Sequence, residues 1–229
     1  MRVPLLFNVV ILATASVLAQ SQPHAFENEI RAFEASDKTN PPPKHAILFL
    51  GSSSIRMWKT LAQDFPEYHV INRGFGGSQI ADSVYFAERV VVPYQPRVIV
   101  FYAGVNDINA GKSAEAVFDD FKTFFSKVRA TLPATKVAFI AAAPNPARWK
   151  QIDRVRELNR LVRDYAAYRT GLSFVDVHSA MLGTDGQPKP DIYIADELHM
   201  NARGYAIWKR LVADHLHSIE PPRFPAAGQ

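Results

Sequence analysis

Short apolar segments alternate along this chain with longer segments whose apolar residues recur at helical spacing. The apolar segments cover residues 46–50, 69–71, 98–102, 137–141 and 172–177, and most are apolar at consecutive positions. Strands that are covered on both faces show such continuous runs. The helical pattern covers residues 83–91, 114–130, 151–168 and 201–217. This alternation predicts an α/β fold, a three-layer α/β/α sandwich around a mostly parallel five-stranded sheet.

Composition limits the classes of protein that the chain can belong to. Its 229 residues suffice for one well-buried domain, and a hydrophobic fraction of 48% is ordinary for a globular protein. The net charge of +4 is small and Lys and Arg form no run, which argues against a nucleic-acid partner. The chain has no cysteine, which excludes disulfides, thiolate metal ligands and a cysteine nucleophile.

Residues 1–19 have the layout of a secretory signal peptide. Arg2 supplies positive charge, residues 3–18 carry none, and Val17 and Ala19 suit cleavage before Gln20. We therefore expect export, to the periplasm or the extracellular space, with no membrane-spanning segment left after cleavage. The alternative is a retained membrane anchor, although the apolar stretch is short for the roughly 30 Å of a bilayer core.

The rest of the chain divides into three segments. Residues 20–43 are expected to hold an amphipathic helix, at residues 24–38, and a connector with three prolines that stop the helix. The alternative for this segment is a disordered leader. Residues 44–220 are expected to form the α/β domain, and residues 221–229 a C-terminal tail.

Four polar or glycine-rich motifs each follow a predicted strand. They are Gly-Ser-Ser-Ser at residues 51–54, a glycine cluster at 74–77, Gly-Val-Asn-Asp at 104–107 and Asp-Glu-Leu-His at 196–199. Each alone is ordinary as a turn, a helix cap or a surface pair. In an open parallel sheet, however, ligands bind beyond the carboxyl ends of the strands. The four motifs together therefore predict one site at that edge.

These motifs resemble the conserved blocks of the SGNH hydrolase superfamily, which includes the GDSL esterases and lipases. The superfamily is named after a Ser, a Gly, an Asn and a His, and this chain has Ser53, Gly76, Asn106 and His199 in that order. The resemblance covers about residues 46–217 and implies a flavodoxin-like sandwich that hydrolyses carboxylic esters. Ser52 departs from the family, whose first block commonly has Asp there. The departure leaves open which of the three serines attacks, although alignment to the block favours Ser53.

The chemistry of ester hydrolysis explains why these residue types occur together. Ser53 is the expected nucleophile, and His199 the base that takes its proton. Asp196, three residues before His199, is expected to orient the imidazole. The resemblance further implies an oxyanion hole made of the backbone N–H groups of Ser53 and Gly76 and the side-chain amide of Asn106.

Other kinds of site fit the sequence less well. Gln79 stands where a dinucleotide-binding motif requires its third glycine. The Asp196–His199 motif contains one histidine where a zinc-protease helix has two, and His178 is expected to be a packing or loop residue. We therefore expect no metal and no organic cofactor. A non-catalytic protein that binds carbohydrate or lipid remains the alternative from a different class.

The sequence constrains the substrate only weakly. A short acyl group, above all acetyl, on a carbohydrate or other small ester is the preferred hypothesis, and a lysophospholipase-type acylhydrolase is the alternative. An acyltransferase and any oligomeric state also stay open. Side chains expected to line the cleft and bind substrate are Phe75, Asn145, Trp149 and Tyr193, with Trp58 and Arg148 as further candidates. For these residues, local packing is the competing interpretation.

Overall fold

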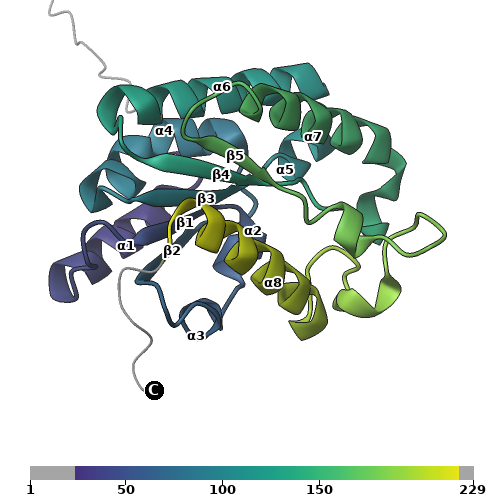
Figure 1. Ribbon diagram of the computed structural model, residues 1–229, viewed down its shortest axis with the longest axis horizontal. Helices are drawn as coiled ribbons and strands as arrows, with labels where there is room; N and C mark the ends of the chain where they lie inside the picture. The colour runs from purple at the N-terminus through teal and green to yellow at the C-terminus, as the bar shows by residue number, and fades with distance from the viewer. Residues whose placement is uncertain (1–23, 222–229) are drawn as a thin grey trace, which may run out of the picture.

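A five-stranded parallel sheet forms the centre of the computed structural model, which describes residues 24–221 (Figure 1). The strands are β1 (Ile47–Gly51), β2 (Val70–Gly74), β3 (Val98–Tyr102), β4 (Lys136–Ile140) and β5 (Leu172–Val175). Their order across the sheet is β2-β1-β3-β4-β5, and every neighbouring pair is parallel. The predicted α/β fold and sheet are therefore confirmed. The predicted signal peptide lies outside the described residues.

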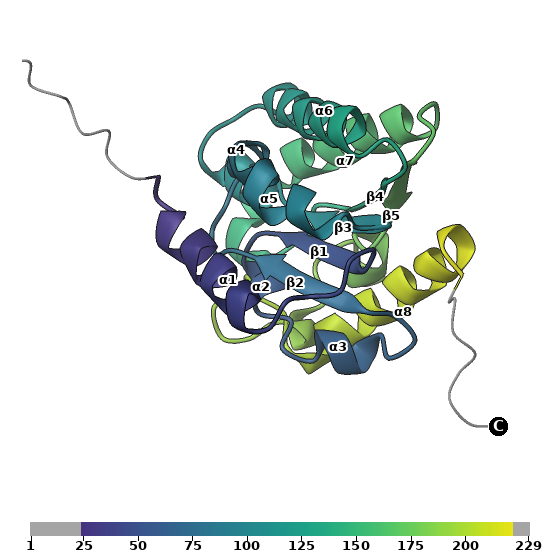
Figure 2. The same ribbon diagram turned by 90° about the vertical axis from the view of Figure 1, so that its left-hand side faces the viewer.

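Helices cover both faces of this sheet. They are α1 (Glu27–Thr39), α2 (Ser53–Arg56), α3 (Leu61–Asp64), α4 (Ile80–Val90), α5 (Val105–Asn109), α6 (Ala114–Thr131), α7 (Ile152–Ala166) and α8 (Ala202–Ile219). Short 3₁₀ helices span Val92–Tyr94, Pro146–Gln151, Ser179–Met181 and Pro190–Ile192. Figure 2 shows α4, α6 and α7 on one side of the sheet and α3 and α8 on the other. No helix within residues 24–221 is long and apolar enough to cross a membrane.

The core lies on both sides of the two central strands, β1 and β3, which are buried at every position. On one side, Phe101 of β3 stacks on Phe124 of α6, with ring centroids 4.5 Å apart, and Phe121 packs edge-on against Phe139. The buried residues of α6 are Ala114, Val117, Phe121, Phe124, Phe125 and Val128, whereas Phe118 is only partly buried, beside Tyr165. Aromatic packing of this kind adds to the stabilisation from buried apolar area.

The N-terminal helix α1 is joined to the sheet and to α4 by charged contacts. The Arg89 guanidinium of α4 donates to Glu34 at 2.6 Å and to Glu27 at 2.8 Å. In β2, Arg73 pairs with Asp37, whose carboxylate also accepts a hydrogen bond from Tyr94. The stretch predicted to be helical is therefore helical from Glu27 and packs against the domain.

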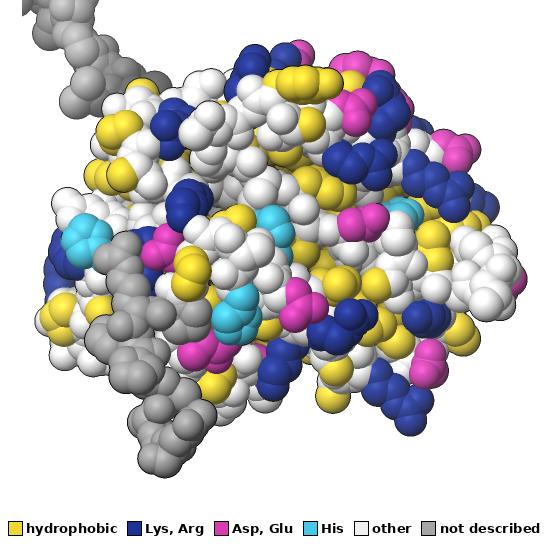
Figure 3. Space-filling model, viewed as in Figure 1, with side chains coloured by type: hydrophobic (Ala, Val, Ile, Leu, Met, Phe, Trp, Pro, Cys, Tyr) yellow, Lys and Arg dark blue, Asp and Glu magenta, His cyan; other side chains and the backbone are white. Residues whose placement is uncertain are grey.

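The surface of the molecule mixes charges of both signs. On the face seen in Figure 3, Lys and Arg side chains are interspersed with Asp and Glu. Some charged side chains of the surface pair along one helix, as Arg160 of α7 does with Glu157 and Asp164. Exposed pairs of this type typically contribute well under ~1 kcal/mol each, so the fold depends on its core.

Gly51, at the end of β1, lies too close to the backbone of β3 for a side chain to fit. Its φ is +143°, and a Cβ atom there would lie 1.8 Å from the carbonyl oxygen of Tyr102 in β3. Alanine at this position would therefore force β1 and β3 apart.

We expect Gly51→Ala to lower the free energy of unfolding by about 3 kcal/mol or more, because the clash is with backbone that cannot move alone. Gly111→Ala is the control, since Gly111 also has a positive φ, +96°, but an open surrounding. It should cost about 1–2 kcal/mol. Urea denaturation followed by circular dichroism measures both, and equal losses would contradict the role of the clash.

Candidate active site

Ser53 begins the short helix α2 immediately after β1. Its Oγ lies 2.8 Å from Nε2 of His199, 146 residues later in the chain. No such contact links His199 to Ser52, which is buried, or to Ser54, whose carbonyl accepts a hydrogen bond from Tyr205. Among the three adjacent serines, Ser53 is the one that the fold places against the histidine.

Asp196 holds the other nitrogen of the His199 ring. Its Oδ2 lies 2.6 Å from Nδ1 of His199, and its Oδ1 accepts backbone N–H groups of Leu198, at 3.0 Å, and His199, at 2.9 Å. Because an ionised carboxylate only accepts hydrogen bonds, we assign the ring proton to Nδ1. That tautomer leaves Nε2 with a free lone pair facing the Ser53 hydroxyl.

The turn that carries Asp196 and His199 is held in an unusual backbone conformation. Glu197 has a φ of +56°, in the left-handed region that non-glycine residues rarely adopt. Its carbonyl accepts the N–H of Ala147, at 3.2 Å, and the N–H of Ile194 donates to the carbonyl of His199, at 2.9 Å. The first bond joins the turn to the segment after β4, and the second closes the turn itself.

The hydrogen bonds around Asp196 also determine its protonation. Burial acts to raise the pKa of Asp196, but hydrogen bonds from the His199 ring and from the N–H groups of His199 and Leu198 outweigh it. The result is a pKa of about 2. The carboxylate is therefore ionised at any pH near neutrality.

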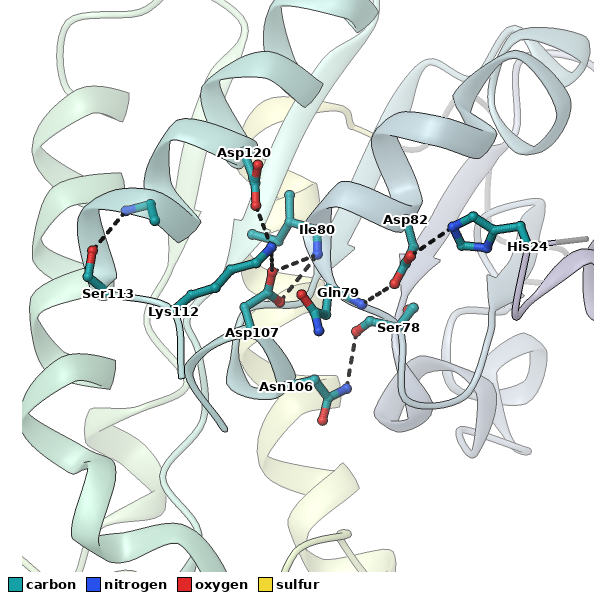
Figure 4. A network of polar contacts seen from close by, with 11 residues as sticks. His24, Ser78, Gln79, Ile80, Asp82, Asn106, Asp107, Lys112, Ser113 and Asp120 are labelled. Atoms are coloured by element: carbon teal, nitrogen blue, oxygen red, sulfur yellow. Dashed lines mark hydrogen bonds and ion pairs between the residues drawn. The ribbon is translucent and has the colours of Figure 1, made fainter. Parts of the chain in front are cut away.

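Asn106 lies beside this arrangement on α5, after β3. Its Nδ2 donates to the carbonyl of Ser78, at 3.1 Å, in the segment between β2 and α4 (Figure 4). Its Oδ1 accepts from Nη1 of Arg148, at 2.8 Å. The amide is thus oriented from both ends, and one N–H of its Nδ2 stays without a hydrogen bond among residues 24–221.

Asp107, the next residue, forms a hydrogen bond with the first residue of α4, at the end of the same segment. Its buried carboxylate accepts the N–H of Ile80, at 3.2 Å from both oxygens, and pairs with Lys112 at 3.3 Å (Figure 4). Burial raises the pKa of Asp107, and Lys112 partly offsets this effect. The contact caps the N-terminus of α4 with a negative charge. Sequence reasoning treated this Asp only as a turn or cap residue, and nothing in a single sequence reveals the long-range contact.

In the glycine loop, residues 75–79 between β2 and α4, one hydrogen-bond donor of the expected oxyanion hole is already engaged. The N–H of Gly76 is not free, because it donates to Oε2 of Glu29 in α1, at 3.2 Å. Glu29 also pairs with Arg56, whose guanidinium occupies the space where a Gly76 side chain would be. The next residue, Gly77, has a φ of +80° and open space around it, and within residues 24–221 its N–H has no hydrogen-bond acceptor.

A narrow cleft opens over Ser53 and His199. It encloses a cavity of about 20 Å³, little more than one water-sized sphere. Besides the three serines and His199, its walls are formed by Tyr102, Val105, Asn106, Ala143, Pro144, Asn145, Arg148, Met181, Tyr193, Leu198, Met200 and Trp208. The cleft thus contains three of the expected cleft residues, Asn145, Arg148 and Tyr193, and the side chains of Asn145 and Tyr193 are largely engaged. Asn145 accepts the N–H of Arg148, and the Tyr193 hydroxyl donates to the carbonyl of Pro144.

The other expected cleft residues lie elsewhere. Phe75 is fully buried between Phe26 and Phe86, because its loop turns the ring into the core. Trp58 is buried as well, and packs against Phe49, Phe65, Tyr205 and Trp208. Trp149 does not line the cleft, and the guanidinium of Arg156 lies 5.5 Å from its ring centroid. The rings of Phe75 and Trp58 thus lie in the core, and Trp149 lies outside the walls of the cleft.

The buried histidine His178 belongs to the packing of the sheet edge. Its Nδ1 lies 3.0 Å from the carbonyl of Ala142 and 3.3 Å from Nδ2 of Asn159. Burial lowers the pKa of His178 and favours its neutral form. Within residues 24–221, no group of three or more His, Cys, Asp or Glu side chains could hold a metal ion.

Most of the chain matches a known protein family. The model of the GDSL-like lipase/acylhydrolase family matches residues 47–207, which include every strand and the Ser53, Asn106 and His199 positions. The chain belongs to this family. Membership supports a hydrolase, and the expected resemblance to SGNH hydrolases is confirmed.

Solved structures of similar proteins share the fold. A GDSL-like lipase from Bacteroides thetaiotaomicron is 19% identical with a TM-score of 0.70, and the match covers 83% of this chain and 98% of the other. A lipase/acylhydrolase from Enterococcus faecalis is 19% identical with a TM-score of 0.66, and the match covers 79% of this chain and 100% of the other. A carbohydrate esterase family 3 protein from Talaromyces cellulolyticus is 16% identical with a TM-score of 0.61, and the match covers 76% of this chain and 96% of the other. No curated protein matches the sequence.

The lowered pKa of Asp196 makes a prediction about stability. A group whose pKa falls on folding stabilises the folded state above its ordinary pKa, here 3.8, and this stabilisation disappears as the pH drops through the folded value, about 2. Asp196→Asn should therefore reduce the free energy of unfolding near neutrality, with a difference from the original chain that shrinks between about pH 4 and about pH 2.

Urea denaturation across this pH range measures the effect. Asp153→Asn serves as the control, because Asp153 is 96% exposed on α7. Its difference from the original chain should be small throughout. A difference for Asp196→Asn that is the same at every pH would show that the contacts with His199 and Leu198 do not keep the carboxylate ionised.

Proposed function

We propose that this protein is a serine-dependent hydrolase of carboxylic esters with short acyl groups, in which Ser53, His199 and Asp196 act as the catalytic triad. The observation that carries the proposal is the continuous chain of hydrogen bonds from Ser53 Oγ through the His199 ring to Asp196, at 2.8 Å and 2.6 Å. A serine hydroxyl is a weak nucleophile unless a base takes its proton. This arrangement supplies the base and the group that orients it.

In the first half of the reaction, Ser53 Oγ attacks the acyl carbon while His199 Nε2 accepts the hydroxyl proton. Asp196 stabilises the imidazolium that forms, since it is already ionised and bonded to Nδ1. The tetrahedral intermediate then collapses, its bond to the alcohol oxygen breaks, and His199 returns the proton to the departing alcohol. A water molecule activated by His199 hydrolyses the acyl-enzyme by the same steps and regenerates Ser53.

We propose that three donors stabilise the oxyanion of each intermediate. They are the N–H of Ser53, the free N–H of the Asn106 amide and the N–H of Gly77. Gly77 replaces Gly76 in this role because the N–H of Gly76 is occupied by Glu29. The neighbour of Gly77, Ser78, accepts a hydrogen bond from Asn106, which keeps the two donors close together. Each donor of this kind typically lowers the barrier by about 3 kcal/mol.

The size of the cleft favours a short acyl group. Its cavity of about 20 Å³ is walled by the bulky side chains of Tyr102, Met200 and Trp208, so an acetyl group fits better than a long chain. The similarity in fold to a carbohydrate esterase is consistent with an ester on a sugar or other small alcohol. We further propose that the protein acts outside the cytoplasm, on the basis of the signal-peptide pattern at residues 1–19.

The role of the triad is tested by hydrolysis of p-nitrophenyl acetate. Ser53→Ala and His199→Ala should each lower kcat by about 10³-fold or more, because nucleophile and base act as one unit. The matched variant Ser52→Ala removes a neighbouring hydroxyl that does not contact His199 and should retain most activity. Turnover by Ser53→Ala at the original rate would refute Ser53 as nucleophile, and no turnover by the original chain would favour a binding protein.

Acyl-chain preference is tested with p-nitrophenyl acetate, butyrate and octanoate. We expect kcat/KM for acetate to exceed that for octanoate by at least about 10-fold, because a long chain does not fit the cavity. A preference for octanoate would instead support a long-chain acylhydrolase of the lysophospholipase type.

A further inference from the structure

The cleft contains one cation that no residue neutralises. Arg148 lines the cleft together with Ser53 and His199, and no other Lys or Arg and no Asp or Glu belongs to its walls. Within residues 24–221, no carboxylate lies within ion-pairing distance of its guanidinium. Other half-buried arginines pair with acids: Arg73 with Asp37, and Arg97 with Glu220. Arg148 is therefore a half-buried charge that lacks its counter-ion.

The contacts of Arg148 use only one side of the guanidinium. Its Nη1 donates to Oδ1 of Asn106, at 2.8 Å, and to the carbonyl of Val105, at 3.4 Å. Its backbone N–H donates to Asn145, which fixes the start of the side chain. A guanidinium has five N–H groups in a planar fork, and those on Nε and Nη2 have no acceptor in the part of the chain that the structure describes.

A charge in this environment favours the binding of an anion. Burial disfavours the charged form and lowers the pKa of Arg148, so an anionic partner would recover the lost solvation. The fork formed by Nε and Nη2 matches the two oxygens of a carboxylate or phosphate. The Asn106 contact places this fork one side chain away from the proposed oxyanion hole, within the length of a small substrate.

We propose that Arg148 binds a carboxylate or phosphate on the alcohol portion of the ester, so that the substrate is an acylated acidic alcohol such as an acidic sugar. This inference rests on the proposed function for the existence of an ester. We assign the anion to the alcohol portion because the acyl group of the proposed reaction is short and uncharged.

A second role for Arg148 makes a different prediction. If its only task is to hold Asn106, its loss weakens the oxyanion hole and slows every ester by the same factor. If it binds an anion, its loss slows anionic esters more than neutral ones. The ratio of kcat/KM for an anionic and a neutral ester therefore separates the two roles.

The test compares 4-acetoxybenzoate and 4-acetoxyphenyl phosphate with the uncharged methyl 4-acetoxybenzoate, at low ionic strength. The original chain should prefer the anionic esters, and Arg148→Gln should reduce that preference by about 10- to 100-fold. Arg148→Lys should keep part of it, which also covers the case in which Arg148→Gln does not fold. Arg154→Gln is the matched control, because Arg154 is exposed on α7 and its loss changes the net charge equally. The carboxylate and phosphate esters distinguish the two anions.

An equal loss on charged and neutral esters, or no anionic preference in the original chain, would overturn the inference while leaving the proposed function intact. Binding of 4-hydroxybenzoate to Ser53→Ala, measured by calorimetry, gives a readout that needs no turnover. If no ester is hydrolysed but this binding disappears in Ser53→Ala/Arg148→Gln, the proposed function fails and the anion site stands. Binding that does not depend on Arg148 overturns the anion site.

Discussion

The parallel pairing of β1 with β2 on one side and with β3 on the other determines where Ser53, the glycine loop and Asn106 lie in the candidate site. Gly51, the last residue of β1, is in register with Gly74 of β2 and with Tyr102 of β3. The three strands therefore end at the same level, and Ser53, the glycine loop and Asn106 leave the sheet side by side. The pairing is close enough that position 51 tolerates no Cβ atom. The reactive groups are thus held by the most buried part of the molecule, as preorganised catalysis requires.

Much of the fold could be predicted from the sequence because its buried strands are continuous apolar runs. The prediction for 98–102 coincides with β3, whereas β2 extends to Gly74, beyond the predicted 69–71. The polar residues Asn72 and Arg73 interrupt the apolar run, so the extension was not predicted from it. An edge strand such as β2 is less completely covered than a central strand and accommodates polar side chains. The helices α2, α3 and α5 were not predicted, because four or five residues are too few to show a periodic pattern. Two of them, α2 and α5, begin directly beyond the ends of β1 and β3.

The site was predictable to the extent that chemistry restricts residue types. The pattern of motifs grouped Ser53, Asp196 and His199, and the structure brings these side chains into hydrogen-bond contact. Roles that depend on where a group points were not predictable. The N–H of Gly76 faces Glu29, the ring of Phe75 faces the core, and Asp107 supports a helix 27 residues away in sequence. Single-sequence reasoning has no access to these directions, because each is decided by a residue distant in the chain.

The contacts of Glu29 and its neighbours on α1 limit how far this protein can be truncated. The family segment begins at residue 47 and ends at 207, yet α1 ends at Thr39 and α8 continues to Ile219, with Leu216 fully buried. A chain trimmed to the family segment would leave Arg73 and Arg89 without their carboxylates and Gly76 without its acceptor, and would remove most of α8 from one face of the sheet. The autonomous folding unit is therefore longer than the homologous segment at both ends, and an expression vector for this protein should encode all of α1 and α8.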